Sequence, residues 1–126
     1  MLRCAPLIAA LVATALPAAA QLQRNFPATA LRGELRVTQA PEALLNNRPA
    51  RLAPGSRIRG TDNMLLMSGA VAGAPLLVHY TLDTNGLVLD VWVLTPAEAA
   101  RKPWPATPEQ AQSWRFSPDS QTWSRP

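Results

Sequence analysis

The chain has 126 residues, of which 48% are hydrophobic, and it contains 13 prolines, one cysteine and one histidine. This length allows one compact domain, so an enzyme with separate cofactor and substrate domains is excluded. The single cysteine excludes internal disulfides and cysteine-cluster metal sites, and the single histidine excludes centres with several histidine ligands. We therefore expect neither a bound metal nor a cofactor.

The first 20 residues have the organisation of a secretory signal peptide. A short N-terminal region with the positively charged Arg3 precedes an apolar stretch over residues 4–16. Residues 17–20 end in an Ala-x-Ala cleavage pattern. The apolar stretch is shorter than the roughly 20 residues that a membrane-spanning helix needs. We predict cleavage between Ala20 and Gln21, export to the periplasm or the medium, and no transmembrane anchor in the mature chain.

Cleavage changes the charge of the protein only slightly. Lysine plus arginine fall from 12 to 11 with the loss of Arg3, while the acidic residues stay at 8, so the net charge falls from +4 to +3. Export and this mild charge argue against nucleic acid as a partner. The expected partner is an anionic envelope component, such as a lipid head group, lipopolysaccharide or a peptidoglycan carboxylate, or another exported protein. The sequence does not define an oligomeric state.

Short apolar segments separated by turn signals predict a single β-rich domain over residues 31–126, after a linker over residues 21–30. Residues 31–38 alternate between apolar and polar side chains, which is the pattern of a half-buried strand. The Asn-Asn pair at residues 46–47 predicts a hairpin turn, because asparagine tolerates a positive φ. Pro54-Gly55 predicts another turn, which would divide the following segment into two short strands.

The strongest hairpin signal joins residues 76–82 to residues 87–94 through an Asn-Gly turn. A two-residue turn places Trp92 opposite His79, whereas a four-residue loop places Asp90 there. The two registers differ by two residues, so both put the same side chains on each face. One face is wholly apolar and is expected in the core. The other face, which holds His79 and Trp92, is too apolar to face water and needs a cover.

The C-terminal segment is the nearest candidate for that cover. Thr95 and Thr107 each precede a proline and a glutamate, which predicts the capped starts of two short helices. The remaining residues predict a terminal hairpin, and the segment supplies large aromatic side chains, namely Trp104, Trp114, Phe116 and Trp123. Packing against the sheet is the expected role of these aromatics, and a stacking platform for sugar or peptide is the alternative. The expected fold is mainly β, a small antiparallel sheet or partly open barrel with two short helices and a C-terminal hairpin.

His79 is the only side chain expected to titrate near neutral pH. If Asp90 is its neighbour, the pair would orient an imidazole for general-base catalysis, and a small hydrolase or isomerase using His79 and Asp90 is the alternative function. No Gly-x-Ser-x-Gly nucleophile motif is present, and the carboxylates are too dispersed for glycoside hydrolysis. We therefore expect a packing or hydrogen-bonding role for His79.

Met64 and Met67, together with His79, are conceivable soft ligands for Cu(I), since thioether and imidazole groups both suit that ion. Residues 64 and 67 point to opposite faces of a strand, which separates the two sulfur atoms. Core packing is therefore the expected role of both methionines.

Four arginines fall within 12 residues that contain no acidic residue: Arg48, Arg51, Arg57 and Arg59. The simpler interpretation is the solvated outer face of two short strands. The functional interpretation is a patch for phosphate or carboxylate groups, which the planar guanidinium binds in a bidentate manner. These four residues are the candidate contact surface.

The segments APGSRIRG, HYTLDTNGLVLDVWVLTPAEA and SWRFSPDSQTW resemble small exported bacterial proteins of unknown function, an uncharacterised family. The resemblance extends from Arg32 through Trp123 and implies export and a single domain. It assigns no activity and no catalytic residue. The leading hypothesis is a non-catalytic, envelope-associated binding or interaction module.

Overall fold

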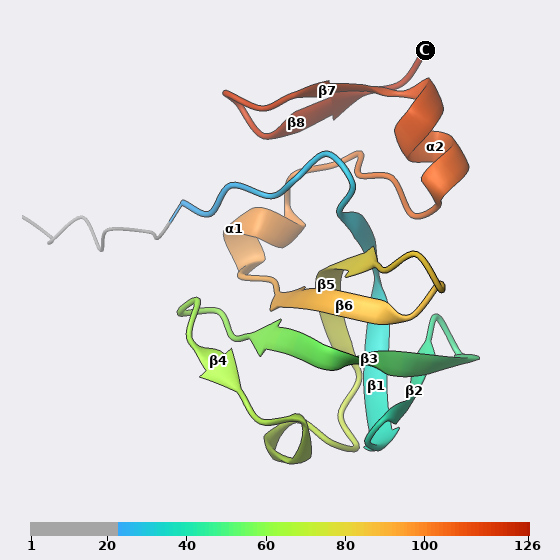
Figure 1. Cartoon of the computed structure of the whole chain (residues 1–126). Coiled ribbons are helices and arrows are strands. Elements are labelled where there is room, and N and C mark those ends of the chain that lie inside the picture. Colours follow the sequence, from blue (N-terminus) through green and yellow to red (C-terminus); the bar gives the residue numbers. More distant parts are fainter. Residues whose placement is uncertain (1–22) are drawn as a thin grey trace, which may run out of the picture.

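The computed structural model describes residues 23–126 (Figure 1). The predicted signal peptide and its cleavage site between Ala20 and Gln21 lie outside the described residues. Within residues 23–126, no helix combines the length and the apolar character that crossing a membrane requires.

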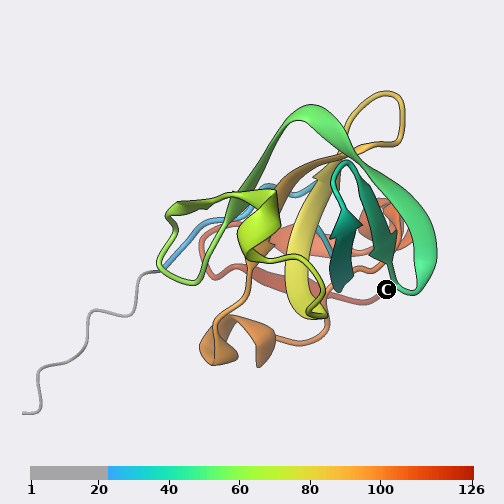
Figure 2. The ribbon, with the colours of Figure 1, turned by 90° about the horizontal axis from the view of Figure 1, so that it is seen from below.

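Five strands form a closed barrel: β1 (Leu31–Gln39), β2 (Glu42–Leu45), β3 (Arg48–Arg59), β5 (Leu76–Leu82) and β6 (Val88–Val93). Around the barrel the order is β1, β2, β3, β6, β5 and β1 again, and all neighbours are antiparallel except β3 and β6. This connectivity is that of the OB-fold, a five-stranded Greek-key barrel. Figure 2 shows the strands wrapping around the interior. The prediction of a mainly β domain built on a small barrel is confirmed.

The barrel closes because β3 is one long, bent strand. Its first part pairs with β2 and its last part pairs with β6 and with the short strand β4 (Leu65–Leu66). Between the pairs Leu52–Val88 and Arg57–Asp90 the register shifts, and Gly55 in this interval has a φ of 77°. The prediction that Pro54-Gly55 separates two strands is therefore wrong. The positive φ creates a bulge that bends the strand and does not reverse the chain.

The β5–β6 hairpin follows the two-residue register near its open end and then departs from it. Tyr80 pairs with Val91 and His79 with Trp92, but Leu82 pairs with Val88 because β6 carries an extra residue. The extra residue turns Val88 toward the interior, where it is 1% exposed, while Leu82 is 39% exposed. The apolar face expected from strict alternation is thus confirmed at the open end and wrong beyond the bulge.

The barrel core contains aliphatic residues and one tyrosine contributed by all five strands. Its fully enclosed members include Leu35, Val78 and Val91, each at 0% exposure. The partly buried Val71, which follows the 3-10 turn η1 (Ser68–Ala70), packs against it. Alternation along each strand is sufficient to place these side chains inside.

A second hydrophobic group, the aromatic cluster, lies outside the barrel wall. Its buried members are Phe26, Ala30, Leu94, Trp104 and Trp123. Phe26 and Ala30 belong to residues 23–30, which were interpreted as a linker. That interpretation is wrong for these residues, because Phe26 is 4% exposed and Ala30 is 0% exposed.

Two short helices and a hairpin complete the cover over this cluster (Figure 1): α1 (Pro96–Ala99), α2 (Pro108–Ser113), β7 (Arg115–Ser117) and β8 (Thr122–Ser124). The Thr95 side chain accepts a hydrogen bond from the Glu98 N–H, and the Glu98 carboxylate accepts one from the Thr95 N–H, which completes a capping box. Thr107 caps α2 in the same manner through the Gln110 N–H. The predicted helix starts and the terminal hairpin are confirmed.

Candidate functional site

His79 is fully buried between the barrel wall and the aromatic cluster. Its ring stacks on Trp104 with the centroids 4.0 Å apart, and Phe26 approaches it edge-on at 4.4 Å. The Arg32 Nε–H donates a hydrogen bond to His79 Nε2 over 3.2 Å, so the ring accepts at that nitrogen. Burial, followed by the positive charges of Arg32 and Arg24, lowers the pKa of His79 to about 2. The imidazole is therefore neutral at neutral pH and has no exposed surface on which to meet a substrate.

Asp90 does not contact His79. The observed register places Trp92 opposite His79, and the Asp90 carboxylate lies near Arg59 and Thr81, with 3.5 Å contacts to Arg59 Nη1 and Thr81 Oγ1. The His79–Asp90 pair on which the alternative function depends is thus not formed. The sequence left both registers open, and the register observed at His79 is the one that a two-residue turn predicts, although the loop itself pairs Asp83 with Leu87.

The sequence did not indicate a buried ion pair that joins the N-terminal segment to α1. Arg24 and Glu98 make two hydrogen bonds, one between Arg24 Nε and Glu98 Oε2 at 2.9 Å and a second between Arg24 Nη2 and Oε1. Arg24 also donates to the carbonyl oxygens of Gly60 and Val93. Burial raises the pKa of Glu98, but the hydrogen bonds from Arg24 and Thr95 outweigh it and hold the pKa below its ordinary value. A cleft of about 230 Å³ beside this pair is smaller than ordinary ligand pockets.

Arg32 completes this polar layer on the outer wall of the barrel. In addition to His79, it donates to the carbonyl oxygens of Glu98 at 2.9 Å and Ala99 at 3.1 Å. Its guanidinium lies 5.6 Å from the Trp104 ring centroid. All of these contacts join segments that are far apart in the chain, so no local pattern could have predicted them. They attach α1 to the barrel, which is a structural role.

The four arginines of the candidate contact surface all lie on β3, but they do not form one patch. Arg48 begins this 12-residue strand and Arg59 ends it. Arg51 pairs with Glu42 of β2 at 3.3 Å, and Arg59 pairs with Asp90 of β6 at 3.5 Å. The stretch that lacks acidic residues in the sequence is therefore bordered by acidic residues in space, and the arginines divide between the two ends of the strand.

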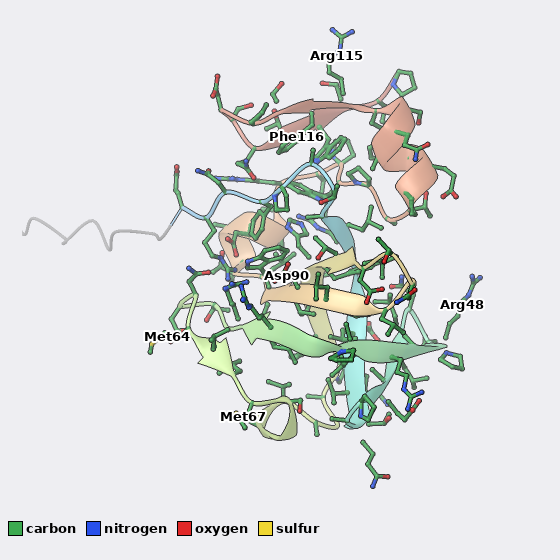
Figure 3. The ribbon with its side chains drawn as sticks, in the orientation of Figure 1. Arg48, Met64, Met67, Asp90, Arg115 and Phe116 are labelled. Carbon is green, nitrogen blue, oxygen red and sulfur yellow. The ribbon has the colours of Figure 1, made fainter. Side chains whose placement is uncertain are left out.

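Arg48 lines a cleft of about 540 Å³, which we call the mouth groove. The groove lies where the β2–β3 and β5–β6 hairpins meet the segment that begins α2. Its lining includes Arg48, Tyr80, Leu82, Val88, Thr107 and Glu109. A second cleft of about 330 Å³ shares Leu82 and Pro108 with it. Figure 3 shows Arg48 projecting from the end of β3.

Met64 and Met67 are on the surface, which contradicts the expectation of core packing. Their exposed fractions are 66% and 81%, and both are seen at the edge of the molecule in Figure 3. Strand β4 is only two residues long, and no other part of residues 23–126 covers this segment. The described residues contain no cluster of three or more histidine, cysteine or carboxylate side chains that would hold a metal ion.

The tryptophans of the C-terminal segment divide between packing and the surface. Trp104 and Trp123 are 7% and 5% exposed, which confirms the expected packing on the sheet. The Trp104 Nε1–H donates to the Ala30 carbonyl oxygen at 2.9 Å. Trp114 is half-buried beneath Arg125, whose guanidinium carbon lies 5.3 Å from its ring centroid. With two of the three rings buried, no continuous stacking platform forms.

Comparison with protein-family models, with curated proteins and with solved structures finds no match to this chain. The resemblance to small exported proteins of unknown function therefore stays a prediction. The mouth groove is the concave site that carries a candidate contact residue, and it has the volume expected of a ligand pocket.

Proposed function

We propose that the mature chain is an exported, non-catalytic binding module of the cell envelope and that it holds its ligand in the mouth groove. The supporting observation is the groove itself, whose volume of about 540 Å³ falls within the range of small-molecule sites. Ligand sites also occur preferentially in the mouths of β-barrels. The signal-like residues 1–20 support the envelope as the place where this module acts.

The lining of the groove favours an anionic ligand with an apolar part. Tyr80, Leu82 and Val88 provide an apolar floor, Arg48 provides the cation of the lining, and Glu109 of α2 adds one carboxylate. A guanidinium binds a carboxylate through two parallel hydrogen bonds, which fixes the orientation of the ligand. A carboxylate next to aliphatic groups is the chemistry of a peptidoglycan peptide stem, and we propose this class of ligand.

The same lining supports binding without catalysis. Among the described residues that line the groove, the titratable side chains are Arg48, Tyr80 and Glu109. Burial raises the pKa of Tyr80, so its hydroxyl stays protonated at neutral pH. His79 lies behind the barrel wall and does not line the groove. The side chains that line the groove thus match recognition better than acid–base chemistry.

Retention on purified peptidoglycan tests the groove. The protein, expressed as the full chain, is applied to sacculi over a series of salt concentrations, together with the variants Arg48→Ser and Leu82→Ser. We expect each variant to lower retention roughly tenfold, because each removes one contact of the order of 1.4 kcal/mol. Arg36→Ser, an exposed arginine of β1 outside the groove, is the matched control and should retain fully.

The outcome that overturns the groove is equal retention of Arg48→Ser, Leu82→Ser and the parent protein. Loss of retention in Arg36→Ser to the same degree would also overturn it, because binding would then follow net charge alone. Export is tested separately by mass spectrometry of the purified protein. A mature N-terminus at Gln21 is expected, and an intact Met1 in the envelope fraction would contradict it.

A further inference from the structure

The segment around β4 exposes more apolar surface than any other part of the described chain. Six large hydrophobic side chains are exposed in residues 23–126, and four of them are consecutive. These four are Met64, Leu65, Leu66 and Met67, with exposed fractions of 66%, 67%, 37% and 81%. Single exposed hydrophobic residues are common on proteins, but a contiguous group marks an interaction surface.

Two arginines of the candidate contact surface share a face with this apolar segment. In the antiparallel β3–β4 pair, Arg59 lies directly opposite Leu65, and directly opposed residues project to the same side of a sheet. Arg57 lies two residues before Arg59 and therefore projects to that side as well. Met67 lies two residues after Leu65, with extended backbone angles of −72° and 139°, and continues the same side. We call Arg57, Arg59, Leu65 and Met67 the β3–β4 face.

The charges on this face are unequally compensated. Arg59 pairs with Asp90 at 3.5 Å and lies 5.8 Å from the Trp92 ring centroid, so it is anchored to the barrel wall. Arg57 is exposed, and no acidic side chain among residues 23–126 pairs with it. Asp62 accepts a hydrogen bond from the Met64 N–H and serves the β3–β4 turn. The face thus presents exposed apolar side chains next to one free guanidinium.

We propose that the β3–β4 face docks on the surface of an anionic phospholipid bilayer. Leu65 and Met67 would enter the head-group region, and Arg57 would contact lipid phosphate, a geometry that suits the guanidinium. Anionic lipids attract cations near their surface, and this attraction adds to the free energy of binding that the apolar side chains contribute. A partner strand is a poorer occupant, because β4 is only two residues long and offers little backbone for pairing.

This docking is compatible with the proposed ligand site but does not depend on it. Arg48 of the mouth groove and Arg57 of the β3–β4 face lie toward opposite ends of β3. In Figure 3, Met64 and Met67 project on one side of the molecule and Arg48 on the other. A protein docked through the β3–β4 face would keep its groove open to the solvent.

Vesicle flotation tests the proposal directly. The protein, expressed as the full chain and purified after export, is floated with vesicles of phosphatidylcholine and with vesicles that also contain phosphatidylglycerol. We expect binding to the anionic vesicles, a loss of roughly tenfold in the double variant Leu65→Ser/Met67→Ser, and a loss of the preference for anionic vesicles in Arg57→Ser. Leu82→Ser and Arg48→Ser, which change the other end of the barrel, are matched controls and should bind vesicles as the parent does.

Several outcomes would overturn bilayer docking. The first is a parent protein that does not float with the anionic vesicles, and the second is undiminished flotation of the double variant. Release of the bound protein by inorganic phosphate would show that the site recognises free phosphate and not the bilayer. A dimer in solution that the double variant abolishes, without vesicle binding, would assign the face to a second copy of the chain. Met67→Ser alone, at an 81% exposed position, keeps the test decisive if the double variant does not fold.

Discussion

Strand β5 separates two hydrophobic clusters that are built in different ways. Val78 and Tyr80 point into the barrel core, which consists of aliphatic residues and one tyrosine. His79, between them in the sequence, points outward to the aromatic cluster, where Trp104 and Phe26 enclose it. The barrel core contains no buried charge, whereas the outer layer includes the Arg24–Glu98 pair. The barrel core thus depends on hydrophobic packing alone, whereas the outer layer depends on packing combined with buried polar contacts.

The two clusters therefore respond differently to pH. The barrel core tolerates changes of pH, because its members do not titrate in the ordinary range. The outer layer holds a neutral histidine and an ionised carboxylate in low-exposure positions, so its stability depends on protonation. Variants in each cluster separate the contribution of packing from that of protonation to the free energy of unfolding.

Trp104→Ala is expected to have the largest effect. Trp104 contacts His79, Phe26, Phe116 and Trp123, with ring centroids 4.0 to 6.0 Å apart. Its removal opens a cavity at the centre of the aromatic cluster and should cost about 4 kcal/mol in urea unfolding. The control Trp114→Ala, at a half-buried position, should cost less than half as much. Equal losses of unfolding free energy in the two variants would show that Trp104 is no more important to the packing of the cluster than Trp114.

Glu98→Ala is expected to cost about 3 kcal/mol, because it leaves the guanidinium of Arg24 buried without its partner. The double variant Arg24→Met/Glu98→Leu should recover most of that loss, since it removes both charges. The control Glu42→Ala breaks an exposed pair with Arg51 and should change stability by about 0.5 kcal/mol or less. A double variant as unstable as Glu98→Ala would contradict the assignment of the cost to the unpaired charge.

Acidification is expected to destabilise the protein through His79. The folded pKa of His79 is lowered to about 2, so below its ordinary pKa of 6.5 the unfolded chain takes up a proton that the folded chain does not. Stability is therefore lost as the pH falls from about 6.5, and between pH 7 and pH 5 the loss should be about 2 kcal/mol. The lowered pKa of Glu98 acts in the same direction at lower pH.

The pH dependence distinguishes the two clusters directly. His79→Gln, which keeps an acceptor for Arg32, should remove most of the slope of unfolding free energy against pH. Leu35→Ala in the barrel core should lower stability at every pH and leave the slope unchanged. A slope that persists in His79→Gln would assign the acid sensitivity to other groups.

Gly55→Ala is expected to have the smallest effect, about 1 kcal/mol, and it tests how the barrel wall bends. Nothing lies within 4 Å of the added methyl group, so the cost comes only from the backbone φ of 77°. Gly69→Ala is the control, because it also meets no neighbour and does not have a positive φ. Thermal unfolding of both variants measures the difference, and an equal effect would show that Gly55 is not needed for the bend.

Local signals predicted most of the elements correctly. Asn46 and Asn47 adopt φ angles of 53° and 64°, as the predicted hairpin turn requires. Thr95 and Thr107 both cap helices, because each hydroxyl accepts a hydrogen bond from the N–H three residues later. The proline that follows each threonine has no N–H that would need a partner. Alternation over residues 31–38 predicted β1, since one face of a strand must be buried. Each of these features depends on residues that are neighbours in the chain.

The candidate sites were less predictable, because charge and exposure depend on segments that the chain brings together. Arg51 and Arg59 form ion pairs with Glu42 and Asp90, which belong to other strands. Met64 and Met67 bound a typical apolar run, yet nothing in the described part of the chain covers them. His79 lies opposite Trp92 and not Asp90, because the turn signal allowed two registers and the pairing of whole strands selected one of them.

The sequence alone determined the mainly β fold, the turns and the helix caps, because these follow from periodicity and from hydrogen bonds within a few residues. Only the tertiary structure decided that β3 bends to close a barrel, that Phe26 and Ala30 are buried, and that Arg24 pairs with Glu98, 74 positions away in the chain. It also decided that the arginines of β3 lie toward opposite ends of one strand and do not form a single patch. Such contacts depend on how bulges rotate and bend whole strands, which no short segment of sequence specifies.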